Sequence, residues 1–178
     1  GPADLDLALD PNPRHTVADV HQDHDRLDSR LLRQCMLEHP GGVLSYAEVD
    51  AWANRIAHRL ARLGVGPDAR VAVCLERSPE LPVAVLAVLR AGAGYVAVDP
   101  AYPAARVAYM LENSRSHVVL TTSDVAERIP AVEGTAVVLL DSEADEIARD
   151  PSHALEVTAD PDNLGYGLYT SACPGLSK

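Results

Sequence analysis

Four short valine-rich runs recur along this chain, and a stretch with helical signals separates each run from the next. The runs are RVAVCLE (70–76), GYVAVD (94–99), HVVLTT (117–122) and TAVVLLD (135–141). Nearly continuous apolar runs are typical of strands that are buried on both faces, and parallel strands need a helix between them. The pattern predicts an α/β fold: a mostly parallel sheet with helices on both faces and right-handed crossovers. LGYGLYTS (164–171) adds a final strand.

The clearest helix is predicted over residues 45–64. Ser45 and Glu48 have the spacing of a capping box, and Gly64 is a stop signal. Trp52 lies one position off the apolar stripe, so we expect it to pack rather than to contact a ligand. Apolar residues recur every three or four positions and form one helical face. This face comprises Val49, Ala53, Ile56, Leu60 and Leu63.

Other local signals place the remaining elements. Ser78 as N-cap and Pro79 at the first helical position open a second helix, and Ser123 opens a short one. AARVAYMLENS (104–114) predicts another helix, and the acidic residues 142–163 indicate a surface helix and linker. LLRQCMLEHPGGVLSY (31–46) predicts an N-terminal hairpin that turns at His-Pro-Gly-Gly.

The length of 178 residues fits one domain of ordinary size. Residues 1–15 are polar, contain Pro11 and Pro13, and are predicted to be a flexible leader; Gly1-Pro2 resembles a tag-cleavage scar. Residues 16–178 are predicted to form the domain, with Thr16 as a helix cap.

The formal charge of −11 argues against nucleic acid and anionic membranes as partners, because both attract basic patches. We expect a cytoplasmic protein, since the chain shows neither a signal peptide nor a spanning apolar run. The three cysteines favour reduced thiols over a disulfide framework. His21 and His24 share a helix face, but no third ligand lies nearby, so no metal site is predicted.

Three stretches together resemble the adenylation domains of nonribosomal peptide synthetases, within the acyl-CoA synthetase and luciferase superfamily. Residues 44–80, beginning LSYAEVDAWANRIAHRL, are similar to the LTYxEL region, and LRAGAGYVAVDPAYPAARVAYMLENS (89–114) is similar to LKAGxAYVPLDPxYPxER. DNLGYGLYTSACPGLSK (162–178) aligns with the phosphate loop, YTSG[ST]TGxPK. Residues 20–36 match poorly, including His21, where the family tends to have an aromatic residue.

The resemblance implies a partial N-terminal subdomain, because it covers only the beginning of such a domain. An intact relative would use ATP and Mg to activate an amino acid and load it onto a carrier protein. The catalytic lysine and the acid that holds the substrate amino group belong to the remainder, so no catalytic residue is assigned to this chain. Condensation, carrier or adenylation domains of an assembly line are the implied neighbours.

The segment that resembles the phosphate loop keeps only part of the family pattern. Four positions match: Thr170, Ser171, Gly175 and Lys178. Ala172 replaces a glycine, Cys173 a hydroxyl and Pro174 a threonine, and Ser177 replaces a proline. Pro174 removes a backbone N–H as well as a hydroxyl, so we expect a remnant loop that holds no nucleotide cofactor. Cys173 has no evident histidine partner and is not expected to be a nucleophile.

A second group of residues fits the family pattern at the loop and helix after the second strand. It comprises Tyr102, Ala104, Ala105 and Arg106. In relatives this neighbourhood can bind small MbtH-like proteins, and the alternative is an ordinary capped surface helix. Asp99, just before it, is expected to accept hydrogen bonds from turn amides.

Three functions remain open from the sequence. The chain is interpreted first as a truncated, non-catalytic structural or docking module of an assembly line. The second is a fragment of an active adenylating enzyme, and the third is a trans-acting protein that recruits an MbtH-like or synthetase partner. Cutting the sheet at residue 178 should also expose an apolar face, which predicts dimerisation, loss of apolar residues there, or cover by the leader.

Overall fold

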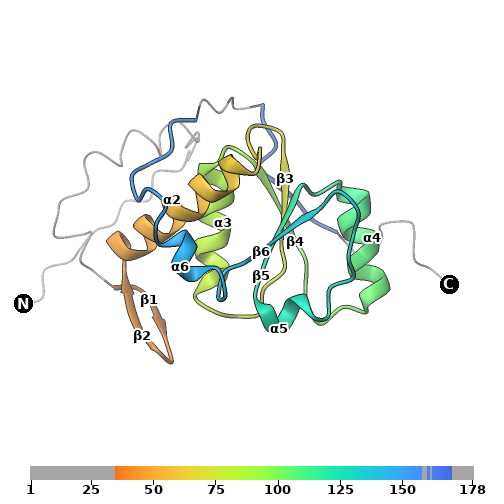
Figure 1. Cartoon of the computed structure of the whole chain (residues 1–178), viewed down its shortest axis with the longest axis horizontal. Coiled ribbons are helices and arrows are strands. Elements are labelled where there is room, and N and C mark those ends of the chain that lie inside the picture. Colours follow the sequence, from red (N-terminus) through yellow and green to blue (C-terminus); the bar gives the residue numbers. More distant parts are fainter. Residues whose placement is uncertain (1–34, 158–159, 161, 170–178) are drawn as a thin grey trace, which may run out of the picture.

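The computed structural model describes residues 35–157, 160 and 162–169 (Figure 1). The predicted leader, the helix after Thr16 and the phosphate-loop residues 170–178 lie outside the described residues. The predicted hairpin is confirmed: β1 (Cys35–His39) pairs antiparallel with β2 (Gly42–Ser45). Gly42 closes its turn at φ 139°, a conformation that L side chains rarely adopt.

The main sheet has five strands in the order β6-β5-β3-β4-β7, and every neighbouring pair is parallel. The strands are β3 (Arg70–Val73), β4 (Gly94–Ala97), β5 (Val118–Thr121), β6 (Ala136–Leu139) and β7 (Tyr166–Gly167). The predicted mostly parallel α/β sheet is therefore confirmed. The strand β3 occupies the centre because β4 pairs with one of its edges and β5 with the other.

Helices cover both faces of this sheet, as predicted (Figure 1). On one face lie α2 (Tyr46–Arg62), α3 (Glu80–Arg90) and α6 (Ala144–Ile147). On the other lie α4 (Ala104–Ser114) and α5 (Ser123–Ala126). Side chains alternate along β3, since Val71 and Val73 belong to the first core and Ala72 and Cys74 to the second.

The helix α2 begins as the capping box predicts. The Ser45 Oγ accepts a hydrogen bond from the Glu48 N–H at 3.3 Å, and the Glu48 Oε2 accepts one from the Ser45 N–H at 2.8 Å. The hydrogen bond from the Ser45 N–H, and next the one that the Ser45 hydroxyl donates to Glu48 Oε2 at 2.7 Å, lower the pKa of the Glu48 carboxyl. Trp52 packs against the core, as expected. Leu63 does not belong to the buried stripe: it is the C-cap and is 44% exposed, because Gly64 turns the chain at φ 80°.

Two other predictions need correction. Helix α3 begins at Glu80 with Pro79 in the N-cap position, so Ser78 is not the cap; its carbonyl accepts from Leu81 N–H in the preceding turn instead. Within the described residues, the final strand spans only two residues of the predicted run 164–171, whose last two residues lie outside them. Because β7 pairs only with β4 at an edge of the sheet, nothing in the described part of the chain extends it, and Leu168 just beyond it is 61% exposed.

Within the described residues, every helix is too short or too polar to cross a membrane. The predicted surface helix and linker form a connecting segment, residues 142–157, that lies along α2. Ile147 and Asp150 in this segment are buried, at 2% and 7% exposure, so it is more than a solvated linker. Arg59 forms ion pairs with Glu143 and Glu146, and Arg62 makes a two-pronged ion pair with Asp150.

Candidate functional site

The carboxyl ends of the parallel strands form the edge of the sheet where this fold places its binding groups. The chain leaves β3 toward α3 on one face and leaves β4 toward α4 on the other. The same divergence separates β3 from β5, whose chain continues into α5. In open α/β sheets, ligands bind at the carboxyl ends of strands where the chain diverges in this way.

The predicted phosphate loop comes after the strand that ends at this same edge. Its residues 170–178 follow β7, and β7 runs parallel to β4. The residue before the loop, Tyr169, is fixed to α4: its hydroxyl donates to the Met110 carbonyl at 3.3 Å and to Asn113 Oδ1 at 2.8 Å. The Tyr169 ring also meets Tyr109 edge-on at 6.4 Å between centroids. Thr170, Ser171, Gly175 and Lys178 themselves lie outside the described residues.

The second predicted group comes together at the start of α4. The Arg106 guanidinium carbon lies 4.6 Å from the centre of the Tyr102 ring, which indicates a cation–π contact. Ala104 and Ala105 are exposed beside it. The structure thus places all four residues on one surface, while their role in partner binding stays a prediction.

Just before this helix, Asp99 acts as the sequence predicts. Its Oδ1 accepts a hydrogen bond from the Ala101 N–H at 2.8 Å. The Tyr102 N–H donates to the Asp99 carbonyl at 3.1 Å, which closes the turn. The turn therefore directs the chain from the end of β4 into α4.

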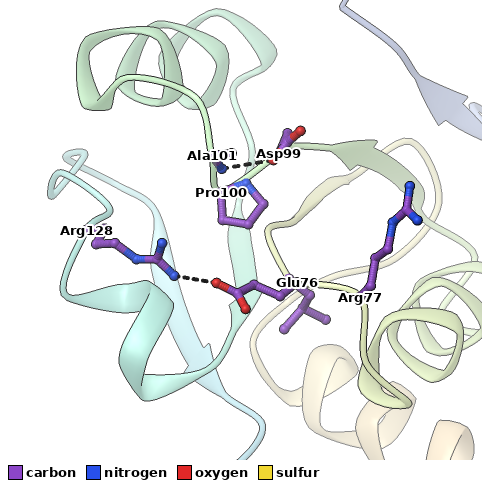
Figure 2. A pocket seen from close by; sticks show the side chains of 7 residues that line it. Glu76, Arg77, Asp99, Pro100, Ala101 and Arg128 are labelled. Atoms are coloured by element: carbon purple, nitrogen blue, oxygen red, sulfur yellow. Dashed lines mark hydrogen bonds and ion pairs between the residues drawn. The ribbon is translucent and has the colours of Figure 1, made fainter. Parts of the chain in front are cut away.

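A pocket that the sequence did not predict lies at the same carboxyl edge (Figure 2). Its volume is about 370 Å³. It is lined by Leu75, Glu76, Arg77, Asp99, Pro100, Ala101 and Arg128. The lining comes from the loop after β3, the turn after β4 and the turn after α5. The available sequence signal was the position of Arg77 directly beyond one predicted strand and of Asp99 as the last residue of the next.

Cys74 lies behind this edge, fully buried at the end of β3. Burial, reinforced by the Asp99 carboxylate, raises the pKa of the Cys74 thiol from 9.0 to about 11. A protonated thiol is a poor nucleophile, so this cysteine has a packing role. It is a free thiol, as predicted for this one of the three cysteines.

Among the described residues, no cluster of three histidine, cysteine or carboxylate side chains could hold a metal ion. The HxxH pair of His21 and His24 lies outside those residues. The described part of the edge therefore offers guanidinium groups and backbone amides rather than a set of metal ligands.

The family of AMP-binding enzymes matches residues 18–178 of this sequence. The chain belongs to this family. A linear gramicidin synthase protein from Brevibacillus parabrevis is 43% identical over 159 residues, which are 89% of this chain and 2% of that protein. Phosphinothricin tripeptide synthetase PhsB from Streptomyces viridochromogenes is 41% identical over 139 residues, 78% of this chain and 12% of the relative.

Solved structures agree with this assignment to the AMP-binding enzymes. The nonribosomal peptide synthetase FmoA3, in its AMPPNP-bound form, matches with a TM-score of 0.78 and 29% identity over 93% of this chain and 17% of that chain. MatB from Rhodopseudomonas palustris matches with a TM-score of 0.70 and 28% identity over 84% of this chain and 31% of that chain.

The chain thus spans only a small part of the relatives that it matches. The resemblance expected from the three motifs is confirmed: the sequence corresponds to a portion of a nonribosomal peptide synthetase adenylation domain. The activity of a whole synthetase does not follow from such a portion alone.

Proposed function

We propose that this AMP-binding family member is a non-catalytic adenylation-like module, which serves an assembly line as a structural or docking domain. The observation that carries the proposal is the composition of its phosphate loop. Ala172 adds a Cβ where the family pattern has glycine, Cys173 offers only a weak thiol donor, and Pro174 has no N–H. The set of donors therefore fits a triphosphate poorly, although ATP and Mg serve the family.

The described structure supports a scaffold role. Within the described residues, two clusters of buried apolar side chains cover the faces of the sheet, and Thr121 of β5 is buried beside them. Tyr169, directly before the phosphate-loop residues, is bonded to α4, so the described chain is anchored up to that point. Condensation, carrier or adenylation domains of the same assembly line are the neighbours that such a module would contact.

Calorimetry of this chain with Mg-ATP tests whether the phosphate loop binds nucleotide. A hydrogen bond to a charged group contributes about 1.5–3 kcal/mol, so losing two or three phosphate donors should abolish binding at sub-millimolar nucleotide. Saturable sub-millimolar binding that Lys178→Gln weakens would overturn the proposal. A variant with Ala172→Gly, Cys173→Ser and Pro174→Thr serves as the matched comparison, because it restores the family donors without touching the described fold.

The alternative is a fragment of an active adenylating enzyme, and the four residues that match the family loop, Thr170, Ser171, Gly175 and Lys178, favour it. Amino-acid-dependent exchange of pyrophosphate into ATP, measured on the natural protein that contains this sequence, separates the two functions. No exchange is expected from the non-catalytic module. Exchange that disappears with Lys178→Gln would establish the enzyme instead.

A third function, recruitment of a partner in trans, is favoured by the surface at the start of α4. Tyr102 and Arg106 stack there beside two exposed alanines, which leaves this surface open to a small MbtH-like protein. Co-purification that Ala105→Glu abolishes would support this role. A chain that remains alone in the presence of an MbtH-like protein would exclude it.

Self-association is one of the possibilities for the exposed edge, beside cover by the N-terminal leader. Tyr166 and Leu168 are each 61% exposed at β7, where the sheet has no further strand within the described residues. Sedimentation of the chain over a range of concentrations should reveal a dimer if a second copy covers this edge. A monomer whose mass is unchanged by Leu168→Ser would count against dimerisation.

A further inference from the structure

We infer that residues 17–31 dock on the outward side of α2 as an amphipathic helix, with the Asp23 carboxylate paired to the Arg55 guanidinium. These residues lie outside the described part of the chain, and only their sequence pattern enters the argument. The surface of α2 that receives them is described. The contact is independent of the phosphate loop and of the proposed function.

Arg55 lacks the kind of partner that the later arginines of α2 have. Arg59 and Arg62 form ion pairs with carboxylates of the connecting segment. Arg55 is half-buried, its Nε–H is closed off from solvent, and no acceptor among the described residues reaches that group. The Nε–H of Arg59, one turn further, is unpaired as well, although its Nη2 binds two carboxylates. Since a buried donor without a partner has lost its hydration without compensation, an acceptor is expected along this side of α2, and a carboxylate suits a guanidinium best.

The side of α2 that carries Arg55 also offers apolar surface. Ala51 and Trp52 precede Arg55 by four and three positions, which places all three on one side of the helix. Both residues are half-buried, and Trp52 also packs against the first core. A helix that lies on this side therefore meets apolar surface beside one unpaired cation.

The segment 17–31 carries the complementary pattern. Its apolar stripe at helical spacing comprises Val17, Val20, Leu27 and Leu31. Asp23 is three positions after Val20 and four before Leu27, so a helix brings this carboxylate onto the same face. The segment contains four aspartates and two arginines, and its net negative charge complements the arginine-rich half of α2.

The point at which the segment enters the described fold agrees with this placement. Cys35, the first residue of β1, pairs with Ser45, the N-cap of α2. Arg55 lies ten positions beyond Ser45, which is about 15 Å along the helix. A helix from Asp23 to Leu31 spans about 12 Å, and the linking residues up to Cys35 reach at most about 14 Å further. Asp23 can therefore lie beside Arg55 when the two helices run antiparallel.

Hydrogen exchange of the complete 178-residue chain, resolved by peptide mass spectrometry, tests this contact. After correction for intrinsic rates, we expect the amides of residues 17–31 to exchange at least about tenfold more slowly than those of residues 3–15. Arg55→Glu should remove this protection, and so should Asp23→Arg. The double variant should restore it, because the exchanged charges form the pair again. Arg115→Glu is the matched control and should change nothing, since Arg115 is an exposed arginine at the end of α4, on the other face of the sheet.

Equal exchange in residues 17–31 and 3–15 of the original chain would overturn the docking. Protection that survives Arg55→Glu, or a double variant that exchanges as fast as the single ones, would overturn the pairing of Asp23 with Arg55. Protection that is lost on dilution would assign this side of α2 to a second copy of the chain instead. Should Arg55→Glu unfold the chain, seen as rapid exchange in β3 and β5, Arg55→Gln replaces it with the same expectation.

Discussion

Replacing Asn54 by alanine should destabilise the domain by about 3 kcal/mol, since Asn54 joins three elements and forms two bonds to charged partners and one to a backbone carbonyl. It is buried in α2, at 1% exposure. Its side-chain amide donates to the Ser152 carbonyl at 2.8 Å and to Asp50 Oδ2 at 3.2 Å. Its Oδ1 accepts from Arg90 Nη1 at 2.7 Å.

The size of this destabilisation depends on which hydrogen bonds remain after Asn54 is replaced. Neutral hydrogen bonds contribute about 1 kcal/mol each and charged ones about 1.5–3 kcal/mol, which would exceed 3 kcal/mol if the losses simply added. Arg90 keeps its bonds to Asp50, so part of the charged contribution survives the substitution. The Ser152 carbonyl loses its partner, which adds a desolvation cost. Against an ordinary total stability of about 5–15 kcal/mol, the loss is large.

Urea unfolding of the chain measures this change in free energy. Asn163→Ala is the control, because Asn163 makes similar side-chain bonds on an exposed turn and should cost about 1 kcal/mol or less. Amide hydrogen exchange should also accelerate in residues 148–157, which Asn54 ties to α2. If Asn54→Ala lowers the free energy of unfolding no more than the control does, or if amide exchange in this segment is unchanged, Asn54 does not connect the three elements.

Three further changes have defined outcomes. Ser45→Ala should lower the free energy of unfolding by about 1 kcal/mol in urea. Because the folded-state pKa of Glu48 is lowered, the stability that the capping box provides should fade as pH falls below about 4.5. Equal stability of the original chain and of Ser45→Ala at every pH would contradict this. Cys74 should resist alkylation at neutral pH, as measured by peptide-resolved mass spectrometry. Because the folded-state pKa of its thiol is raised, the free energy of unfolding should fall as pH rises from 9 toward 11. Rapid alkylation of Cys74 in the native protein would exclude a buried thiol. Gly92→Ala should destabilise by about 1–3 kcal/mol, because Gly92 has φ 75° and an added Cβ would lie 2.6 Å from the Val157 Cγ1; Val157→Ala should restore only the steric part, and full restoration would show that φ does not matter.

Much of the fold could be predicted because its signals are local. The capping box at Ser45 and the helix at 104–114 depend on residues within one or two turns, and both predictions are confirmed. The buried strands could also be predicted, since valine-rich runs between helices leave few alternatives to a parallel sheet. The exact ends of these strands could not be predicted, because a strand ends where its neighbour stops pairing with it.

The errors and omissions involve distant partners. The extent of β7 depends on its pairing with β4, about seventy residues earlier, and the signal in LGYGLYTS did not contain that information. Arg62 and Asp150 are 88 positions apart, so the connecting segment looked like a solvated linker. The pocket combines residues from three loops, and only the strand order brings Arg77 and Arg128 to the same edge.

The position of β7 also bears on how the chain folds as the ribosome makes it. Four of the five strands, β3 to β6, lie between residues 70 and 139, and β7 joins later, at an outer edge. Domains generally fold as units while synthesis proceeds at about 5–20 residues per second. The nascent chain can therefore pair the four strands β3 to β6 before Tyr166 is translated, and β7 then adds to the free edge of β4.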